Sequence, residues 1–386
     1  MPHSRREGQL YSLFWSIALI ICVYLQIMGW FVEILNVDST SGKEAALADL
    51  LQERLATERC TVERFEVGDG TANLLFSWGE PQVVFCTHMD TVPPYIPPTF
   101  DDALGTMSGR GTCDAKGQIY AMYEACRILE SKGYDGFGLL LLAGEETGSF
   151  GAKAFREQHP GAEWLVVGEP TDNCMASASK GTKAFEVTFE GKAFHSGYPQ
   201  YGVSAVELFN DFVNALRSIG FPYDEILGET TWNIGKLQSD NPQNILSDRL
   251  TCRVYFRTTF ESDEMVSSIM KNIAGPQAKL RFGRPKVQDG SDVVAKEVAM
   301  WQRMMTVKAL GGDTPTRYET LEGFPTKPVA FGSDAPQLTN FRRKILCGPG
   351  SILVAHRDDE HIKLQDLHQA ISNYVHMYEL IKKEIL

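Results

Sequence analysis

A set of histidines and acidic residues stands at the ends of apolar segments and in the loops between them. Its members are His88, Asp114, Glu145, Glu146, Glu169 and His356. Imidazole nitrogens and carboxylate oxygens in this combination suit zinc, cobalt or manganese, and no cysteine stands at these positions. One bridging carboxylate, with a histidine and a further carboxylate for each ion, would build a two-metal site about 3.5–4 Å across that activates water and polarises a carbonyl.

The adjacent pair Glu145 and Glu146 offers two different functions. Neighbouring residues in an extended loop point in different directions, so one carboxylate can bind metal while the other takes a proton. A run of four leucines precedes the pair, which favours burial, and buried acids need partners. A solvated loop pair is the alternative, as is an ordinary hydrogen-bonded role for either His88 or His356 taken alone.

The elements that must position these side chains alternate between strands and helices. Residues 83–86, 139–144 and 164–168 are apolar runs of strand length, and polar residues of the set follow each run. A helix with one apolar face is expected at residues 119–129. This alternation predicts a mostly parallel sheet covered on both faces, with a ligand site beyond the carboxyl ends of the strands.

The pattern changes from about residue 176. Residues 183–189 and 250–258 alternate like half-exposed strands, and residues 204–218 have helical spacing. From about residue 285 the first pattern resumes, and an amphipathic helix is expected at residues 365–385. We therefore predict an α/β domain at residues 29–175 and 285–386 with a smaller α+β domain inserted at residues 176–284.

The composition indicates a folded protein and excludes several classes. The 386 residues include 43% hydrophobic and 22% charged residues, which argues against disorder. The net charge of −12 argues against nucleic acid as a partner. The eight cysteines are scattered without a C-x-x-C pair, which favours reduced thiols and a cytoplasmic protein.

The amino terminus allows two interpretations. Residues 10–32 carry no charge and are long enough to span a bilayer, so residues 1–28 are either an apolar extension or a membrane anchor covering residues 10–28. The same run continues into Phe31, Ile34 and Leu35, which a soluble domain would need for its own first helix. A protein start near Met28 is the alternative, and no signal-peptide cleavage site follows the run.

Five segments of the chain resemble the motifs of the M20 metallopeptidases, a family that includes acetylornithine deacetylase, succinyl-diaminopimelate desuccinylase, aminoacylase and related carboxypeptidases. They occur in the family's order after residue 30. The segments are THMDTVP at 87–93, GRGTCDAKG at 109–117, GEETG at 144–148, GEPT at 168–171 and HRDDE at 356–360. The resemblance implies a zinc-peptidase-like catalytic domain with an inserted lid domain that serves in dimerisation.

The resemblance also implies a role for each member of the set. Asp114 would bridge two zinc ions, with cobalt as the alternative metal. One ion would be bound by His88 and Glu169, and the other by Glu146 and His356. Glu145 would be the general base.

Further residues follow from the same resemblance. Asp90 would hydrogen-bond the imidazole of His88 and fix its tautomer. His195 matches a lid histidine that helps stabilise the oxyanion, often across a dimer interface. Asn244 and Arg257 match lid positions that hold the substrate's carboxylate. On closure of the lid we expect His195 and Arg257 to lie over the metals, although each of these three could instead be an ordinary surface or structural residue.

The substrate implied is an N-acyl amino acid or a dipeptide. Residues 347–352 and 355–360 look most like the carboxyl-terminal motif of acetylornithine deacetylases, and Ser333 lies in a segment, 332–336, that looks like their substrate loop. We therefore expect deacetylation of acetylornithine, in arginine biosynthesis, by a homodimer. The alternatives are a dipeptidase or carboxypeptidase, a desuccinylase, or a lysine-biosynthesis carrier hydrolase. The segment 239–243 departs from the family's usual Gly-Gly pair, which bears on the side-chain preference.

Overall fold

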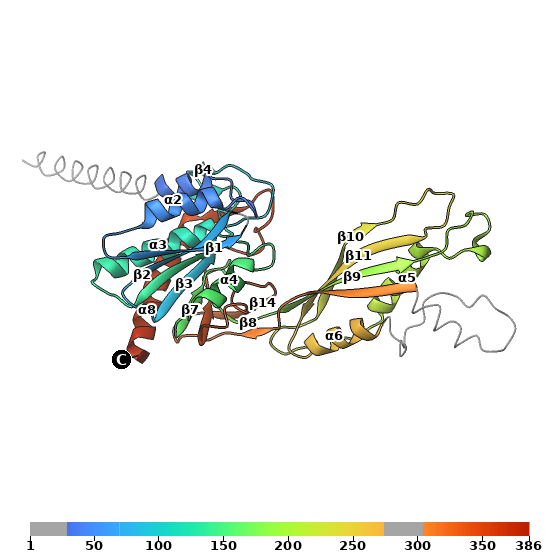
Figure 1. The fold of residues 1–386 in the computed structure, drawn as a ribbon. Helices are drawn as coiled ribbons and strands as arrows, with labels where there is room; N and C mark the ends of the chain where they lie inside the picture. Colours follow the sequence, from blue (N-terminus) through green and yellow to red (C-terminus); the bar gives the residue numbers. More distant parts are fainter. Residues whose placement is uncertain (1–28, 69, 274–303, 386) are drawn as a thin grey trace, which may run out of the picture. The chain divides into compact units, whose positions relative to one another are not determined.

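The computed structural model describes residues 29–68, 70–273 and 304–385 (Figure 1). The chain forms two compact units. The first comprises residues up to 177 together with 318–327 and 333–386, and the second comprises residues 178–317 and 328–332. Most of the second unit is therefore inserted in the sequence of the first.

A six-stranded sheet forms the centre of the first unit. Its strands, in spatial order, are β1 (Thr61–Gly68), β2 (Thr71–Trp78), β6 (Phe137–Leu142), β3 (Val83–His88), β7 (Trp164–Val167) and β15 (Arg343–Leu346). The last four are parallel to one another, while β1 and β2 add an antiparallel edge. Every residue of β2, β3, β6 and β7 is buried, as expected for strands covered on both faces. The predicted α/β fold with a mostly parallel sheet is confirmed.

Helices cover this sheet. They are α2 (Ala45–Leu55), α3 (Lys116–Ser131), α4 (Phe150–Gln158) and α8 (Leu364–Ile385). Alternate residues Leu139 and Leu141 of β6 pack in one core cluster with Ile119 of α3 and Tyr374 of α8. Alternation of this kind places one side of the strand against these helices.

Residues 29–35 are helical and belong to this core. Phe31 and Ile34 are fully buried and Leu35 almost so, as expected if the first helix serves the domain's own core. No helix within residues 29–68, 70–273 and 304–385 is long and apolar enough to cross a membrane. The anchor predicted at residues 10–28 lies outside the described residues.

The described chain also contains two small three-stranded sheets. One contains β4 (Thr99–Asp101), β5 (Thr106–Ser108) and β16 (His361–Lys363). The other contains β8 (Met175–Ser179), β13 (Thr316–Arg317) and β14 (Thr326–Val329), the residues at which the chain changes unit. The pairing of β16 with β5 ties the segment after His356 to the segment before Asp114.

The second unit is an antiparallel sheet with helices. Its strands, in spatial order, are β10 (Thr231–Gln238), β11 (Arg249–Thr258), β9 (Gly181–Glu190) and β12 (Met305–Gly311). Its described helices include α5 (Ala205–Arg217), α6 (Asp263–Asn272) and the short 3-10 turn Pro199–Tyr201. Ser204 caps α5 by accepting a hydrogen bond from the amide of Glu207. Alternate residues of β11 are buried, so one face of the sheet carries the unit's core.

The second unit extends further along the chain than the predicted boundary at residue 284. Strand β12 pairs with β9, and the chain re-enters the first unit only at Tyr318. β12 is an edge strand whose residues are mostly exposed, so its local pattern is weak. Its pairing with a strand more than a hundred residues earlier could not be inferred from local spacing.

Candidate active site

Three neighbouring parallel strands deliver side chains to one edge of the sheet. His88 is the last residue of β3, Glu145 and Glu146 come shortly after β6, and Glu169 comes shortly after β7. Because β3 pairs in parallel with both β6 and β7, their carboxyl ends lie at the same edge. The loops that follow these strands therefore converge.

Asp114 stands between two groups of ligand atoms. Atoms of His88, Asp114 and Glu169 lie within 4.8 Å of one another, and so do atoms of Asp114, Glu146 and His356. One oxygen of Asp114 lies 3.0 Å from Nε2 of His88, and the other lies 3.3 Å from Nε2 of His356. Nε2 of His356 also lies 3.0 Å from a carboxylate oxygen of Glu146. A single carboxylate thus faces both groups.

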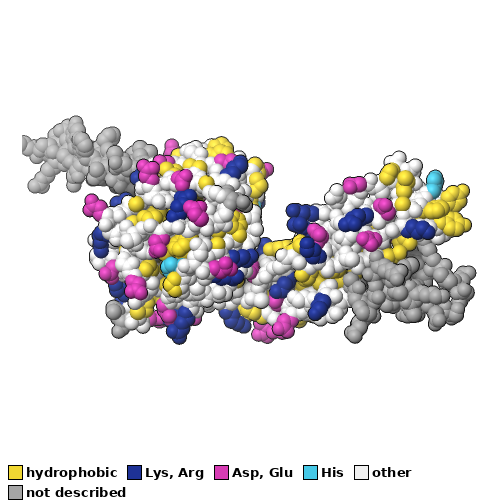
Figure 2. Space-filling model, viewed as in Figure 1, with side chains coloured by type: hydrophobic (Ala, Val, Ile, Leu, Met, Phe, Trp, Pro, Cys, Tyr) yellow, Lys and Arg dark blue, Asp and Glu magenta, His cyan; other side chains and the backbone are white. Residues whose placement is uncertain are grey.

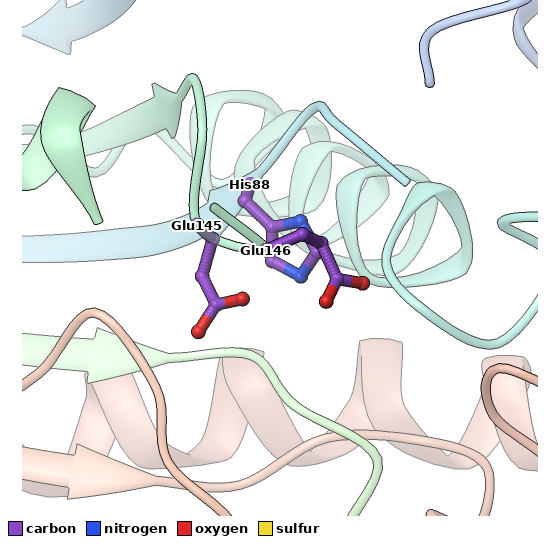
Figure 3. A group of neighbouring side chains, drawn as sticks. All are labelled: His88, Glu145 and Glu146. Atoms are coloured by element: carbon purple, nitrogen blue, oxygen red, sulfur yellow. The ribbon is translucent and has the colours of Figure 1, made fainter. Parts of the chain in front are cut away.

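Glu145 and Glu146 diverge from adjacent backbone positions. Their carboxylates lie on either side of the His88 ring in Figure 3. Ligand atoms of the three residues lie within 4.8 Å of one another. The divergence is the one expected of neighbours in a loop, and it leaves Glu145 free to act beside the two groups that share Asp114.

The electrostatics of the site favour positive charge. Although burial opposes it, hydrogen bonds to Asp114 and Asp90 raise the pKa of His88 well above its usual value. Contacts with Asp114 and Glu146 raise the pKa of His356 to about 10. Burial and then the negative charge of Asp114 raise the pKa of Glu169 well above its usual value. Crowded carboxylates of this kind need a cation or a proton among them.

The donor set therefore fits two divalent cations. Each group supplies one imidazole and two carboxylates, with Asp114 common to both. Nitrogen and oxygen donors without thiolate are typical of zinc, cobalt and manganese sites in which water keeps an open position.

Asp90 contacts both the imidazole of His88 and the loop that carries Glu145 and Glu146. Its backbone oxygen lies 2.9 Å from Nδ1 of His88, closer than its carboxylate at 3.4 Å. The carboxylate instead accepts hydrogen bonds from the amides of Glu145 and Glu146 and from the hydroxyl of Ser41. The fully buried Asp90 thus orients the histidine and holds the Glu145–Glu146 loop.

Ser333 and its neighbour Asp334 have different interactions. Ser333 is buried, and its hydroxyl accepts a hydrogen bond from the amide of Ala335 within its own loop. The negative charge of Asp334, also buried, contributes to raising the pKa of both Glu145 and Glu169. The substrate-binding role expected of Ser333 stays a prediction, and no signal in the sequence indicated the proximity of Asp334 to the acidic cluster.

In the second unit, His195 and Asn244 lie together on exposed segments. His195 pairs with Ile245 in an isolated bridge, and the amide of Ser196 donates to the carbonyl of Asn244. Both residues are exposed. Their segments adjoin the beginning of β11, since the amide of Gly191 bonds to the carbonyl of Asp248.

Arg257 lies at the other end of β11. It pairs with Thr182 of β9 and Thr231 of β10, and its guanidinium lies 5.0 Å from the centre of the Tyr255 ring. Arg249, at the start of the strand, is eight positions away from it, a distance of about 26 Å at the usual rise. His195 and Arg257 therefore lie toward opposite ends of β11, and their placement over the metals on lid closure stays a prediction.

The chain matches known proteins over most of its length. Residues 84–380 match the model of peptidase family M20/M25/M40. A protein of Aspergillus niger named probable carboxypeptidase is 30% identical over 386 residues, covering 90% of this chain and 88% of the relative. A peptidase M20 domain-containing protein of Schizosaccharomyces pombe is 31% identical over 360 residues, covering 89% and 82%.

A solved structure has a similar fold. The tripeptidase of Staphylococcus aureus superposes with a TM-score of 0.71 at 21% identity, covering 90% of this chain and 96% of that one. Similarity at this level of identity concerns the fold.

Proposed function

Because the chain belongs to peptidase family M20/M25/M40, we propose that it is a two-metal peptidase that removes the carboxy-terminal residue of a dipeptide or other small peptide. The relatives named carboxypeptidases favour this substrate class. The observation that carries the proposal is the placement of Asp114, whose two oxygens face two histidines, each with a further carboxylate.

Two groups of residues would hold the metals. His88 and Glu169 would bind one ion, Glu146 and His356 the other, and Asp114 would be shared. Zinc suits these donors, and cobalt is the alternative. Bound there, the ions would lower the pKa of water and polarise the substrate carbonyl.

Glu145 would move the proton. Its carboxylate lies within 4.8 Å of ligand atoms of His88 and Glu146, but it belongs to neither of the two groups that share Asp114. A carboxylate in this place can accept a proton from the attacking water and then donate it to the leaving amine. Burial raises the pKa of Glu145 well above its usual value, which suits a group that must hold that proton between the two steps.

Substrate recognition would come from the second unit. Arg257 would bind the substrate's carboxylate as a bidentate fork, which a carboxypeptidase substrate and an N-acyl amino acid both provide. Asn244, and Ser333 from the first unit, are candidates for further contacts with the substrate. His195 would stabilise the oxyanion formed at the carbonyl.

In a homodimer, His195 of one chain and Arg257 of the other could act at the same site. Since the segment of His195 adjoins the start of β11 and Arg257 lies near the end of that strand, we propose that His195 reaches the site of a second copy of the chain. Large apolar side chains near His195 are exposed, namely Phe194, Tyr198, Tyr201 and Ile245. Figure 2 shows hydrophobic side chains gathered at an end of the second unit. Exposed apolar patches of this kind are common at subunit interfaces.

Deacetylation of acetylornithine is the second candidate. The observation that favours it is the likeness of residues 347–352 and 332–336 to the motifs of acetylornithine deacetylases. A cytoplasmic location would suit either activity, and the described cysteines are all free thiols.

A substrate panel tests the proposal. Zinc- or cobalt-loaded protein would be given dipeptides, amino-terminally blocked dipeptides, their carboxy-terminal amides, acetylornithine and succinyl-diaminopimelate, each with and without a chelator. We expect chelator-sensitive hydrolysis of peptides with a free carboxylate and little of the amides. Faster turnover of acetylornithine than of every peptide would replace the carboxypeptidase assignment with deacetylation, and turnover unaffected by the chelator would contradict both.

A further inference from the structure

A buried ion pair joins the two loops that supply Asp114 and His356. Nη1 of Arg110 lies 2.6 Å from Oε2 of Glu360, and the two side chains are 1% and 0% exposed. The two residues are 250 positions apart in the sequence. Burial of two charges is costly unless hydrogen bonds satisfy both groups, so the remaining contacts of the pair are informative.

Glu360 holds the turn that ends at Asp114. Its Oε1 accepts hydrogen bonds from the amides of Gly111, Cys113 and Asp114 at 2.9, 3.1 and 3.1 Å. Its backbone oxygen accepts a further bond from the amide of Gly109. Bonds from backbone amides to a carboxylate are strong and leave the turn little freedom. The direction in which Asp114 leaves the backbone is therefore set by Glu360.

Arg110 holds the loop that carries His356. Its Nη1 also donates to the carbonyl of Arg357, the residue after His356, at 3.1 Å. The amide of Glu360 closes the same loop on that carbonyl at 3.3 Å. His356 has a φ of 65°, a left-handed conformation that a non-glycine residue keeps only where its surroundings impose it. Arg110 and Glu360 supply part of those surroundings.

We propose that Glu360, acting with Arg110, is a positioning residue that fixes Asp114 relative to His356. It thereby sets how tightly a metal is bound by the group Asp114, Glu146 and His356. The inference rests on the proposed function, because it assumes that these three residues bind a metal. Neither Arg110 nor Glu360 lies among the ligand groups of the described residues. Both act through the backbone of the residues that do.

The physical reason is the small tolerance of a metal site. Ligands must be held within about 0.5 Å of the productive geometry, and groups that orient ligands commonly change metal affinity by about 10- to 100-fold when removed. Asp114 belongs to both ligand groups but His356 to only one, so a change at Glu360, which holds both loops, should weaken the site that contains His356 more than the other. A role in stability alone would lower the melting temperature and leave both affinities unchanged.

The test uses the full chain with Glu360→Gln, which keeps the side chain's size but sets an amide N–H against the Arg110 donor. Zinc affinities and stoichiometry would be measured by competition with a chromophoric chelator, alongside kcat and KM on the best peptide substrate. We expect one of two zinc sites to weaken about 10-fold or more, with kcat lowered and KM within about twofold of the parent.

Two further variants keep the result interpretable. Asp263→Asn removes a less buried ion pair, with Lys183, in the second unit, and should leave both zinc affinities at the parent's values. Arg110→Lys preserves the three amide bonds to Glu360 and should weaken the same site less than Glu360→Gln does. If Glu360→Gln does not fold, Arg110→Lys takes its place, and weakened zinc binding at one site is again the expected result.

Parent-like zinc affinities and kcat in the folded variant would overturn the inference and leave the proposed function intact. Equal weakening of both sites, or of the Asp263→Asn control, would also overturn it, because the effect would then be general. A parent protein that binds no zinc or cobalt would instead refute the proposed function itself.

Discussion

Glu145 and Glu146 are sequence neighbours in different surroundings. Glu146 contacts His356 and shares a group with Asp114, whereas Glu145 stands beside His88 without joining either group that contains Asp114. The amides of both residues are held by Asp90. Two carboxylates on one rigid loop can therefore bind metal and transfer a proton without exchanging roles.

Replacement of Glu145 separates these roles. Glu145→Gln should lower kcat by about 10²- to 10⁴-fold, because the amide cannot accept the proton of the attacking water, and two metals should remain bound. The measurement is steady-state kinetics together with metal analysis of the purified variant. Glu146→Gln is the matched control and should lose metal. A Glu145→Gln protein that hydrolyses as fast as the parent would show that the base lies elsewhere.

Arg257 should recognise the substrate's carboxylate. Loss of a hydrogen bond to a charged group costs about 1.5–3 kcal/mol, so Arg257→Gln should lower kcat/KM by roughly 10- to 150-fold for substrates with a free carboxylate. For their carboxy-terminal amides the variant and the parent should be alike. Arg253→Gln, on the same strand and paired with Glu186 at 3.6 Å, is the control and should behave as the parent does. Equal losses for acids and amides would remove Arg257 from carboxylate recognition.

The sequence predicted the residues of the proposed metal cluster better than the residues that hold them in place. His88, Glu146 and Glu169 could be selected because polar residues after buried strands meet at one edge, whereas the roles of Asp114 and His356 followed from the resemblance of their segments to family motifs. Glu360 was noticed only as part of a motif, since its contacts are with backbone amides 246 to 249 residues away. No local pattern encodes a side chain that bonds to distant backbone.

At the scale of elements, the turn after β6 determines where the two glutamates point. Gly144 has a φ of 69°, and a Cβ at this position would lie 1.7 Å from the ring of Phe150, the first residue of α4. Only glycine fits both the conformation and the space. The turn from strand to helix is therefore tight because the helix packs directly against it.

Gly144→Ala should distort the Glu145–Glu146 loop. The left-handed conformation alone costs about 1–3 kcal/mol, and the clash with Phe150 adds to it. Stability, zinc affinity and kcat should therefore all fall, as measured by thermal unfolding, chelator competition and kinetics. Gly133→Ala is the control, because Gly133 has a φ of 77° but nothing lies within 4 Å of its would-be Cβ. Zinc affinity unchanged in Gly144→Ala would mean that the turn does not position the ligands.

Most strands and helices could be predicted from hydrophobic spacing because they are long or continuously buried. The strands around residues 83–86, 139–144 and 164–168 and the helix near 365–385 all correspond to described elements. The short strands β4, β5, β13 and β16 were not anticipated, since two or three residues carry no period. Strand β12 was also not predicted, because it is an exposed edge strand whose partner lies far away in the sequence.

At the scale of the whole molecule, the proposed dimer would make each site a product of two chains. Glu145 and the proposed metal ligands belong to the first unit, and His195 belongs to the second. If His195 acts on the partner's site, two inactive variants can complement each other. Such behaviour distinguishes a shared site from a dimer in which each chain works alone.

Mixed dimers test the shared site. Subunits with His195→Ala and with Glu145→Gln, unfolded and reassembled in equal amounts, should recover about one quarter of the parent activity, because half of the dimers are mixed and each has one complete site. Reassembly of either variant alone is the control and should stay inactive. A mixture as inactive as its components, with dimers verified by sedimentation, would place His195 in its own chain's site or outside catalysis.

If Asp114 bridges two metals, crystals grown with zinc should contain both ions beside it. Anomalous difference density collected above and below the zinc edge locates each ion without reference to the ligands. We predict two peaks about 3.5–4 Å apart, one beside His88 and Glu169 and one beside Glu146 and His356, with Asp114 between them. A single peak, or peaks that do not contact Asp114, would show that Asp114 does not bridge two metals.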